Sequence, residues 1–259
     1  MTAAIVLADV GKQFLRAGRT VDALVGISLA VEPRQFVAIL GPSGCGKSTL
    51  LNMVAGFDQP SSGSVTVNGQ QVAAPSPRRG VVFQEPALFP WQSVLANVTF
   101  GARRSGQPKA AYLPRAAAII AQVGLGGFES HYPAELSGGM KQRVGLARVL
   151  MLDPDVLLMD EPFGALDAQT RSVMQELLLE VWERTRQTVL FITHDIEESL
   201  LLADVIHVMT ARPGRLKQRL VVDLPRPRTL DVTMSAEFNA MKQQIRALIR
   251  AEASHAAST

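Results

Sequence analysis

The residues with the clearest chemistry lie in the segment Gly41-Pro42-Ser43-Gly44-Cys45-Gly46-Lys47-Ser48-Thr49. It fits the pattern G-x-x-x-x-G-K-[ST], in which glycines let backbone N–H groups converge on a phosphate. An apolar strand is expected at 36–40 and a helix at 48–55, and a helix start adds partial positive charge to the site. A glycine-rich turn with an unrelated lysine is the alternative, which the flanking elements disfavour. We therefore predict a phosphate-binding loop in which Lys47 reaches the terminal phosphates of a nucleotide and Ser48 binds Mg²⁺.

Two adjacent carboxylates follow a second apolar strand. Asp160 and Glu161 come directly after the expected strand 156–159. Neighbouring side chains on an extended chain point in different directions, so one carboxylate can face a metal while the next faces water. In nucleotide hydrolases an aspartate at this place holds the water shell of Mg²⁺. Two acidic residues that only end a strand are the alternative.

A second anion-binding helix start is predicted at 136–143. Ser137 is a good N-cap for a helix at 141–150, and Gly138 and Gly139 let a ligand approach the backbone. One nucleotide does not need two such sites from one chain. We infer that this second site serves the nucleotide of another copy of the chain.

The order of the elements predicts an α/β fold with a mostly parallel sheet covered by helices on both faces. Strands are also expected at 80–83 and 189–192, and they end before Gln84 and Thr193-His194. Parallel sheets place their sites at the carboxyl ends of strands. The sequence therefore predicts one active centre from residues that follow strands, namely Lys47, Gln84, Asp160, Glu161 and His194.

The remaining elements are expected around this core. Strands at 5–8 and 27–31 flank a polar loop, Asn68-Gly69 marks a hairpin, and 205–209 is the last core strand. An inserted helical subdomain is expected at about 86–150. The main domain is expected to span 1–222. A short linker and a helix at about 235–251 fill 223–259, which is too short for a separate regulatory domain.

Composition limits the other possibilities. Of 259 residues, 47% are hydrophobic and 19% charged, which excludes a disordered chain. The net charge of +3 is too weak to argue for nucleic acid, and none is expected as a partner. Cys45 is the one cysteine, so no disulfide can form within the chain and a reducing cytosol is expected. The first residues do not resemble a signal peptide, and we expect any work at a membrane to need a partner.

With these motifs in order, the sequence resembles the ATP-binding cassette (ABC) ATPases of transporters from about Ile5 to Arg219. In the family's terms, the phosphate loop is the Walker A motif and Leu136–Gln142 is the signature, which is highly specific. Val156–Glu161 is the Walker B strand, and Ala165-Leu166-Asp167 is the D-loop. The resemblance implies a P-loop NTPase core with an antiparallel β subdomain and an inserted helical subdomain.

The resemblance also implies the roles of residues. Phe14 stacks on adenine, Gln84 is the Q-loop residue that contacts metal and water, Glu161 is the general base and His194 contacts the γ-phosphate. The expected ligands of Mg²⁺, partly through water, are Ser48, Gln84 and Asp160. ATP is expected to contact Phe14, Gly41, Pro42, Ser43, Gly44, Cys45, Gly46, Lys47, Ser48, Thr49, Gln84 and Asp160. A head-to-tail homodimer would complete each site with the second copy's Ser137, Gly138, Gly139 and Gln142, and Asp167 is the expected D-loop residue.

Within the family, the sequence is most similar to the nitrate, sulfonate and taurine importers. The likeness rests on segments such as 80–91, 159–167, 193–199 and Arg212-Pro213-Gly214-Arg215, with the tail Phe238–Met241 closest to the taurine members. It implies transmembrane permease subunits, a periplasmic or lipid-anchored solute-binding protein, and a peripheral place on the cytoplasmic face of the inner membrane. A soluble ABC-type ATPase of another system, and an importer for a pyrimidine or bicarbonate, are the alternatives.

Other proteins with such a nucleotide site are disfavoured. DNA-repair ATPases insert a long coiled coil between the phosphate loop and the signature, whereas here the two motifs are close and no sustained heptads separate them. Translation factors of this kind carry two cassettes, whereas this sequence contains one. A non-hydrolytic scaffold would not need both Glu161 and His194. Phe89 and Trp91 are expected either to bind a short helix of the permease or to form the subdomain core.

Overall fold

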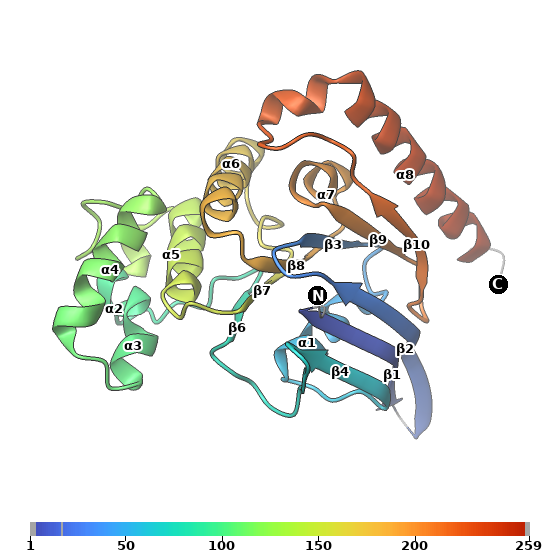
Figure 1. The fold of residues 1–259 in the computed structure, drawn as a ribbon, viewed down its shortest axis with the longest axis horizontal. Coiled ribbons are helices and arrows are strands. Elements are labelled where there is room, and N and C mark those ends of the chain that lie inside the picture. Colours follow the sequence, from blue (N-terminus) through green and yellow to red (C-terminus); the bar gives the residue numbers. More distant parts are fainter. Residues whose placement is uncertain (1–3, 17, 257–259) are drawn as a thin grey trace. The chain divides into compact units, whose positions relative to one another are not determined.

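The computed structural model describes residues 4–16 and 18–256, which fall into two compact units. Unit 1 comprises Met1–Ser76 and Thr185–Thr259, and unit 2 comprises Pro77–Arg184. Both units contain strands and helices, as the expected α/β fold requires (Figure 1). No helix in the described ranges combines the length and the apolar character that crossing a bilayer demands.

Unit 1 is built around a mostly parallel group of strands. Strand β3 (Phe36–Leu40) pairs in parallel with β8 (Thr188–Thr193) and with β9 (Val205–Met209). β10 (Leu216–Val221) is antiparallel to β9. All residues of β3, β8 and β9 are buried, which explains their continuous apolar sequences. Helices α1 (Lys47–Ala55) and α7 (Ile196–Leu202) lie on opposite sides of these strands (Figure 1).

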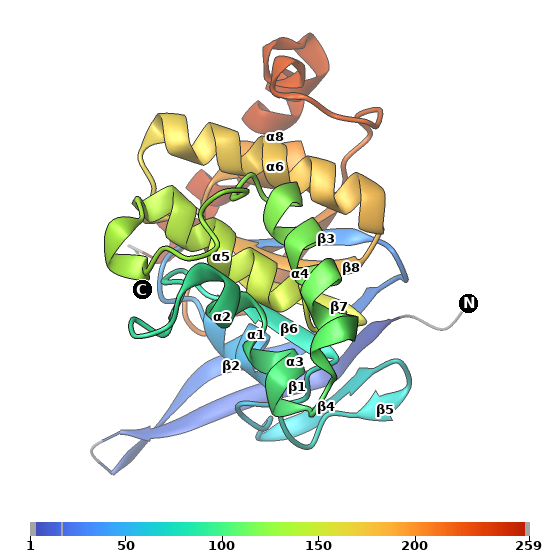
Figure 2. The same cartoon turned by 90° about the vertical axis from the view of Figure 1, so that its left-hand side faces the viewer.

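The antiparallel sheet of unit 1 corrects one expectation. Strands β1 (Ile5–Arg16) and β2 (Arg19–Val31) form one long hairpin, paired as far as Arg16 and Arg19 (Figure 2). β4 (Ser62–Val67) pairs with β1, and the short β5 (Gln70–Gln71) pairs with β4. The polar loop expected between residues 8 and 27 is therefore wrong. One face of this hairpin is exposed, so polar side chains are compatible with strand there.

Unit 2 combines two parallel strands with a group of helices. β6 (Arg79–Val82) pairs with β7 (Val156–Asp160), and Val82 lies opposite Met159. The helices are α2 (Val94–Val98), α3 (Phe100–Arg104), α4 (Lys109–Gln122), α5 (Gly138–Leu150) and α6 (Ala168–Thr185), with the 3₁₀ turn η1 (Pro133–Glu135) before α5. Figure 2 shows α2, α3, α4 and α5 grouped together, as the expected helical subdomain requires. The exact domain boundaries stay a prediction.

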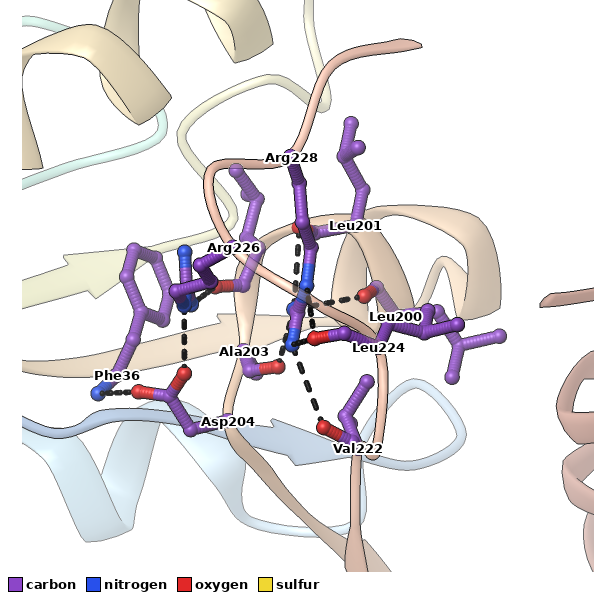
Figure 3. Close-up of polar contacts among 10 residues, drawn as sticks. Phe36, Leu200, Leu201, Ala203, Asp204, Val222, Leu224, Arg226 and Arg228 are labelled. Atoms are coloured by element: carbon purple, nitrogen blue, oxygen red, sulfur yellow. Dashed lines mark hydrogen bonds and ion pairs between the residues drawn. The ribbon is translucent and has the colours of Figure 1, made fainter. Parts of the chain in front are cut away.

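The C-terminal segment of unit 1 is held by two arginines. The Arg228 guanidinium is buried and donates to carbonyl oxygens of Leu200, Leu201 and Ala203 at the end of α7, and to those of Val222 and Leu224 (Figure 3). A cation at a helix C-terminus is favourable because unpaired carbonyls gather there. The segment continues through η2 (Leu230–Met234) into α8 (Ala236–Ala256), slightly longer than expected.

Arg226 connects the same segment to the start of the central strand. Its Nε donates to Asp204 Oδ1 at 2.7 Å, and Asp204 Oδ2 accepts from the Phe36 N–H at 2.8 Å (Figure 3). On α8, Phe238 and Ile245 are buried, and Lys242 forms an ion pair with Glu197 of α7. The tail is therefore an integral part of unit 1.

We predict that Arg228→Met lowers the free energy of unfolding by about 3 kcal/mol, because it removes charge-assisted hydrogen bonds and leaves buried carbonyls without donors. Urea unfolding followed by circular dichroism measures the change. Arg246→Met, at an exposed position of α8, is the matched control and should change stability by less than about 0.5 kcal/mol. Equal losses of stability in Arg228→Met and Arg246→Met would contradict the stabilising role of the Arg228 hydrogen bonds.

We also predict a pH-dependent stability from His207 of β9. Burial, and then the positive charge of Arg219 opposite it, lower the His207 pKa to about 4. The unfolded chain binds this proton below about pH 6.5, so stability is complete above that pH and falls as pH drops toward 4, by up to about 3 kcal/mol. Unfolding midpoints measured between pH 7 and 4 should fall less for His207→Leu. If the unfolding midpoints of the wild type and of His207→Leu fall equally between pH 7 and 4, the prediction is rejected.

Candidate nucleotide-binding site

The phosphate loop of unit 1 starts where the buried strand β3 ends. Gly41 follows Leu40, and Gly46 is the N-cap of α1 with a φ of 102°, a backbone conformation that favours glycine. Because Gly46 has no side chain, the N-cap residue itself leaves room for a ligand at the start of α1. The first N–H groups of α1 can therefore bind an anion.

Lys47 is positioned to neutralise that anion. Its side chain is 4% exposed, and Nζ donates to the carbonyl oxygens of Gly41 at 2.9 Å and Pro42 at 3.0 Å. The ammonium group therefore lies against the start of the loop instead of extending into solvent. Ser48 is exposed at the beginning of α1, while Cys45 is buried within the loop.

His194 lies at the same edge of the sheet as the loop. Leu40 pairs with Thr193, so the loop and His194 both follow the carboxyl ends of neighbouring strands. The exposed His194 sits in a fixed turn, in which Thr193 Oγ1 donates to the buried Glu198 and accepts from the Asp195 N–H. Asp195 caps α7 through the N–H groups of Glu197 and Glu198.

Phe14 lies on β1 and is 41% exposed, so its ring can accept a stacking partner. The Lys12 Nζ is 5.1 Å from the ring centroid, and it also pairs with Asp58 at 2.5 Å. Lys12 therefore helps to hold the ring in place.

In unit 2, the residues after β6 and β7 lie together. The pairing of Val82 with Met159 places the chain leading to Gln84 beside the chain leading to Asp160 and Glu161. The Gln84 amide nitrogen is 3.2 Å from the point where a Cβ on Gly164 would lie. Glu161 has a φ of 43°, which is rare for a residue with a side chain, and its carbonyl accepts from the Gly164 N–H. Backbone strain of this kind is often found at functional sites.

The predicted signature also takes the expected local form. Ser137 is the N-cap of α5, and its hydroxyl accepts from the Met140 N–H. Gly139 lies so close to α6 that a Cβ there would be 2.4 Å from the Thr170 Cγ2. Hydrogen bonds from Thr170 lower the pKa of Asp167, which therefore stays ionised before α6. The structure thus brings the Ser137–Gly139 segment and the Asp167 segment together within unit 2.

Gln142 occupies a buried position on α5. Its side chain is 3% exposed, and Nε2 donates to the Phe83 carbonyl at 3.1 Å. This hydrogen bond connects the signature helix to the residue before Gln84. A role for Gln142 toward a second copy of the chain stays a prediction.

Two further contacts were not predicted from the sequence. Arg212 and Gly214, in the turn after β9, lie against the phosphate loop. The Pro-Gly pair predicts only a turn, and no local pattern indicates what that turn contacts.

A buried parallel strand that leads through a glycine loop and a lysine into a helix defines a phosphate-binding α/β protein. The model of the ABC transporter family matches residues 24–164. The chain is 53% identical over 206 residues to the taurine import ATP-binding protein TauB of Pseudomonas entomophila, with 80% of each chain covered.

Solved structures agree with this similarity. The dimeric structure of the ABC transporter cassette MJ0796 is 30% identical with a TM-score of 0.75, covering 85% of this chain and all of that one. A second dimeric structure of that cassette, in a post-hydrolysis state bound to ADP and Pi, is 29% identical with a TM-score of 0.74 over the same shares. The chain belongs to the ABC transporter family and is an ATPase of the cassette type.

The two signature glycines give a test of the packing at α5. We predict that Gly139→Ala destabilises the protein by about 1–3 kcal/mol, because the new methyl group would overlap Thr170. Gly138→Ala is the matched control, since its new Cβ would lie at an ordinary 3.9 Å from the Leu166 Cδ2. Thr170→Ser removes the overlapping methyl group and should offset much of the Gly139→Ala effect in a double-mutant cycle of urea unfolding. Purely additive effects would contradict this contact.

Proposed function

We propose that the phosphate loop binds the phosphates of ATP, with Lys47 at the terminal phosphates and Ser48 and Thr49 at the start of α1. The carrying observation is the combination of the buried Lys47 side chain with a helix start whose N-cap is a glycine in the left-handed conformation. Phe14 stacks on the adenine, which its exposure allows. The other loop residues, Gly41 to Gly46, contribute backbone N–H groups.

The residues also fit Mg²⁺. Ser48, Asp160 and Gln84 offer oxygen ligands, partly through water, and the metal neutralises charge on the phosphates. The described ranges contain no cluster of three or more His, Cys, Asp or Glu side chains able to hold a metal. Such a cluster is unnecessary, because Mg²⁺ is usually bound by one or two carboxylates together with substrate phosphates.

Hydrolysis is a displacement at the γ-phosphorus. Glu161 orients the attacking water and accepts its proton, while the bond between the γ-phosphorus and the bridging oxygen breaks to give ADP and phosphate. Gln84 would help to hold the metal and the water, and His194 stabilises the γ-phosphate oxygens. The places of these residues, each after the carboxyl end of a strand, support these roles.

We further propose that a second copy of the chain completes each ATP site. Ser137, Gly138 and Gly139 of one copy bind the γ-phosphate held by the other, and Asp167 contributes to the interface. The N-terminus of α5 supports this role, because Ser137 caps the Met140 N–H and Gly138 is exposed without a side chain to cover the backbone. The dimeric structures of a similar cassette support a twofold arrangement.

The chain would then energise an importer for a small anionic or zwitterionic solute, such as taurine, an aliphatic sulfonate or nitrate. The 53% identity to a taurine import ATP-binding protein supports this substrate class. The partners would be two permease subunits in the inner membrane and, indirectly, a periplasmic or lipid-anchored solute-binding protein. The chain would bind the permease at the cytoplasmic face as a peripheral subunit.

We predict that Glu161→Gln lowers kcat for ATP hydrolysis by at least about 100-fold, because it removes the acceptor for the proton of the attacking water. The dissociation constant for Mg-ATP should change by less than about threefold. Glu180→Gln, at an exposed position of α6, is the matched control and should hydrolyse ATP at the wild-type rate. Phosphate release under steady-state conditions measures the rates. Retained hydrolysis in Glu161→Gln would overturn the assignment of the base.

Transport requires a test in cells. Deletion of the chain should abolish uptake of labelled taurine or of a competing sulfonate, and the wild-type chain should restore it.

Trp91 is 72% exposed, and its ring lies 5.9 Å from that of the half-buried Phe89. This exposure fits a contact with the permease and excludes a core position for Trp91. Trp91→Ala should retain ATPase activity in solution and reduce uptake about fivefold or more, whereas Phe57→Ala, at an exposed phenylalanine of unit 1, should not. Normal uptake of both solutes after deletion would reject this substrate class.

A further inference from the structure

The turn between β9 and β10 packs against the phosphate loop. Gly214 lies so close to Cys45 that a Cβ on Gly214 would be 2.1 Å from the Cys45 carbonyl oxygen. Two residues earlier, Arg212 Nη2 donates to the Gly44 carbonyl at 3.3 Å. In the sequence, Arg212-Pro213-Gly214 contributes only to the family resemblance, and none of the roles above uses these residues.

The same turn is joined to the β1–β2 hairpin. The Gly214 N–H donates to the Ala23 carbonyl at 2.9 Å, and the Gly214 carbonyl accepts from the Val25 N–H at 3.0 Å. Between these bonds, Leu24 is buried, and its side chain lies against both Gly214 and Gly46. The turn, β2 and the phosphate loop therefore pack as one assembly.

These contacts act on two consecutive peptide planes of the loop. A peptide unit is rigid, so the position of its carbonyl oxygen determines the direction of its N–H group. Arg212 holds the carbonyl of the unit whose N–H belongs to Cys45, and this N–H donates to the Pro42 carbonyl at 3.4 Å within the loop. Gly214 blocks movement of the carbonyl of the next unit, whose N–H belongs to Gly46.

We propose that Arg212 and Gly214 are positioning residues of the ATPase, which hold the Gly44–Cys45 and Cys45–Gly46 peptide units, and with them the direction of the Gly46 N–H group, before the phosphates bind. The loop then needs less reorganisation on binding, and pre-organised groups bind more tightly. This inference rests on the proposed function only for the identity of the ligand as the phosphates of ATP. The arrangement of the loop itself is a property of unit 1.

Cys45 gives a direct report on the loop, because it is the only cysteine of the chain and is 1% exposed. Gly214→Ala should raise the rate of Cys45 alkylation by iodoacetamide at least about tenfold, since the methyl group displaces the Cys45 carbonyl. Gly126→Ala is the matched control, because a Cβ there meets nothing within 4 Å, and its rate should stay within about twofold. Equal rates in folded Gly214→Ala and Gly126→Ala would overturn the role of Gly214.

Arg212→Ala tests the proposal at an exposed residue whose replacement should not prevent folding. We expect its KM for ATP to rise about three- to tenfold, as loss of one charged hydrogen bond implies, with kcat within about twofold and an unchanged urea midpoint. Arg215→Ala, in the same turn, is the control and should match the wild type in all three quantities. A merely structural role would shift the midpoint and leave KM unchanged, and that result would overturn the proposal.

The proposed function and the positioning role of Arg212 and Gly214 can be rejected separately. If the wild-type protein does not bind ATP, the proposed function fails, whereas the alkylation rates still test the packing of the loop. If the wild type binds ATP and Arg212→Ala has the wild-type KM, the positioning role fails and the proposed function stands.

Discussion

The structure depends on the close backbone packing that a phosphate loop requires. Several N–H groups must converge on one anion, so the carbonyl groups of the loop face its surroundings and must be held there. In unit 1 the surroundings are the Lys47 ammonium, the side chain of Leu24 and the turn at Arg212–Gly214. Side chains at Gly46 or Gly214 would break this packing, because their Cβ atoms would overlap neighbouring atoms. The glycines of the site are therefore required by contacts as well as by backbone angles.

The same constraint explains features at a distance from the loop. β3 carries the loop, and its first N–H group is bonded to Asp204, which Arg226 in turn holds (Figure 3). Arg228 binds the carbonyls at the end of α7, the helix whose start follows His194. The C-terminal segment thus stabilises two elements that present functional groups, although it contributes no predicted site residue.

Much of the site follows from the sequence because its signals are local. The phosphate loop, the strands ending at Asp160 and Thr193, and the N-cap Ser137 are each encoded within about ten residues. The hairpin of β1 and β2 was underestimated, because the exposed face of its strands resembles a polar loop. The strand β10 was not predicted either, since its residues alternate between exposed and half-buried positions. Contacts of Arg212, Gly214 and Arg228 join segments far apart in the chain, and no local pattern encodes such contacts.

In the proposed dimer, each ATP is bound between the phosphate loop of one copy and the signature of another. Light scattering of Glu161→Gln with saturating Mg-ATP tests it most directly, because this variant should bind ATP without consuming it. The account predicts a particle of twice 27.9 kDa with Mg-ATP and of 27.9 kDa with Mg-ADP. A particle that keeps the single-chain mass while ATP is demonstrably bound would contradict it.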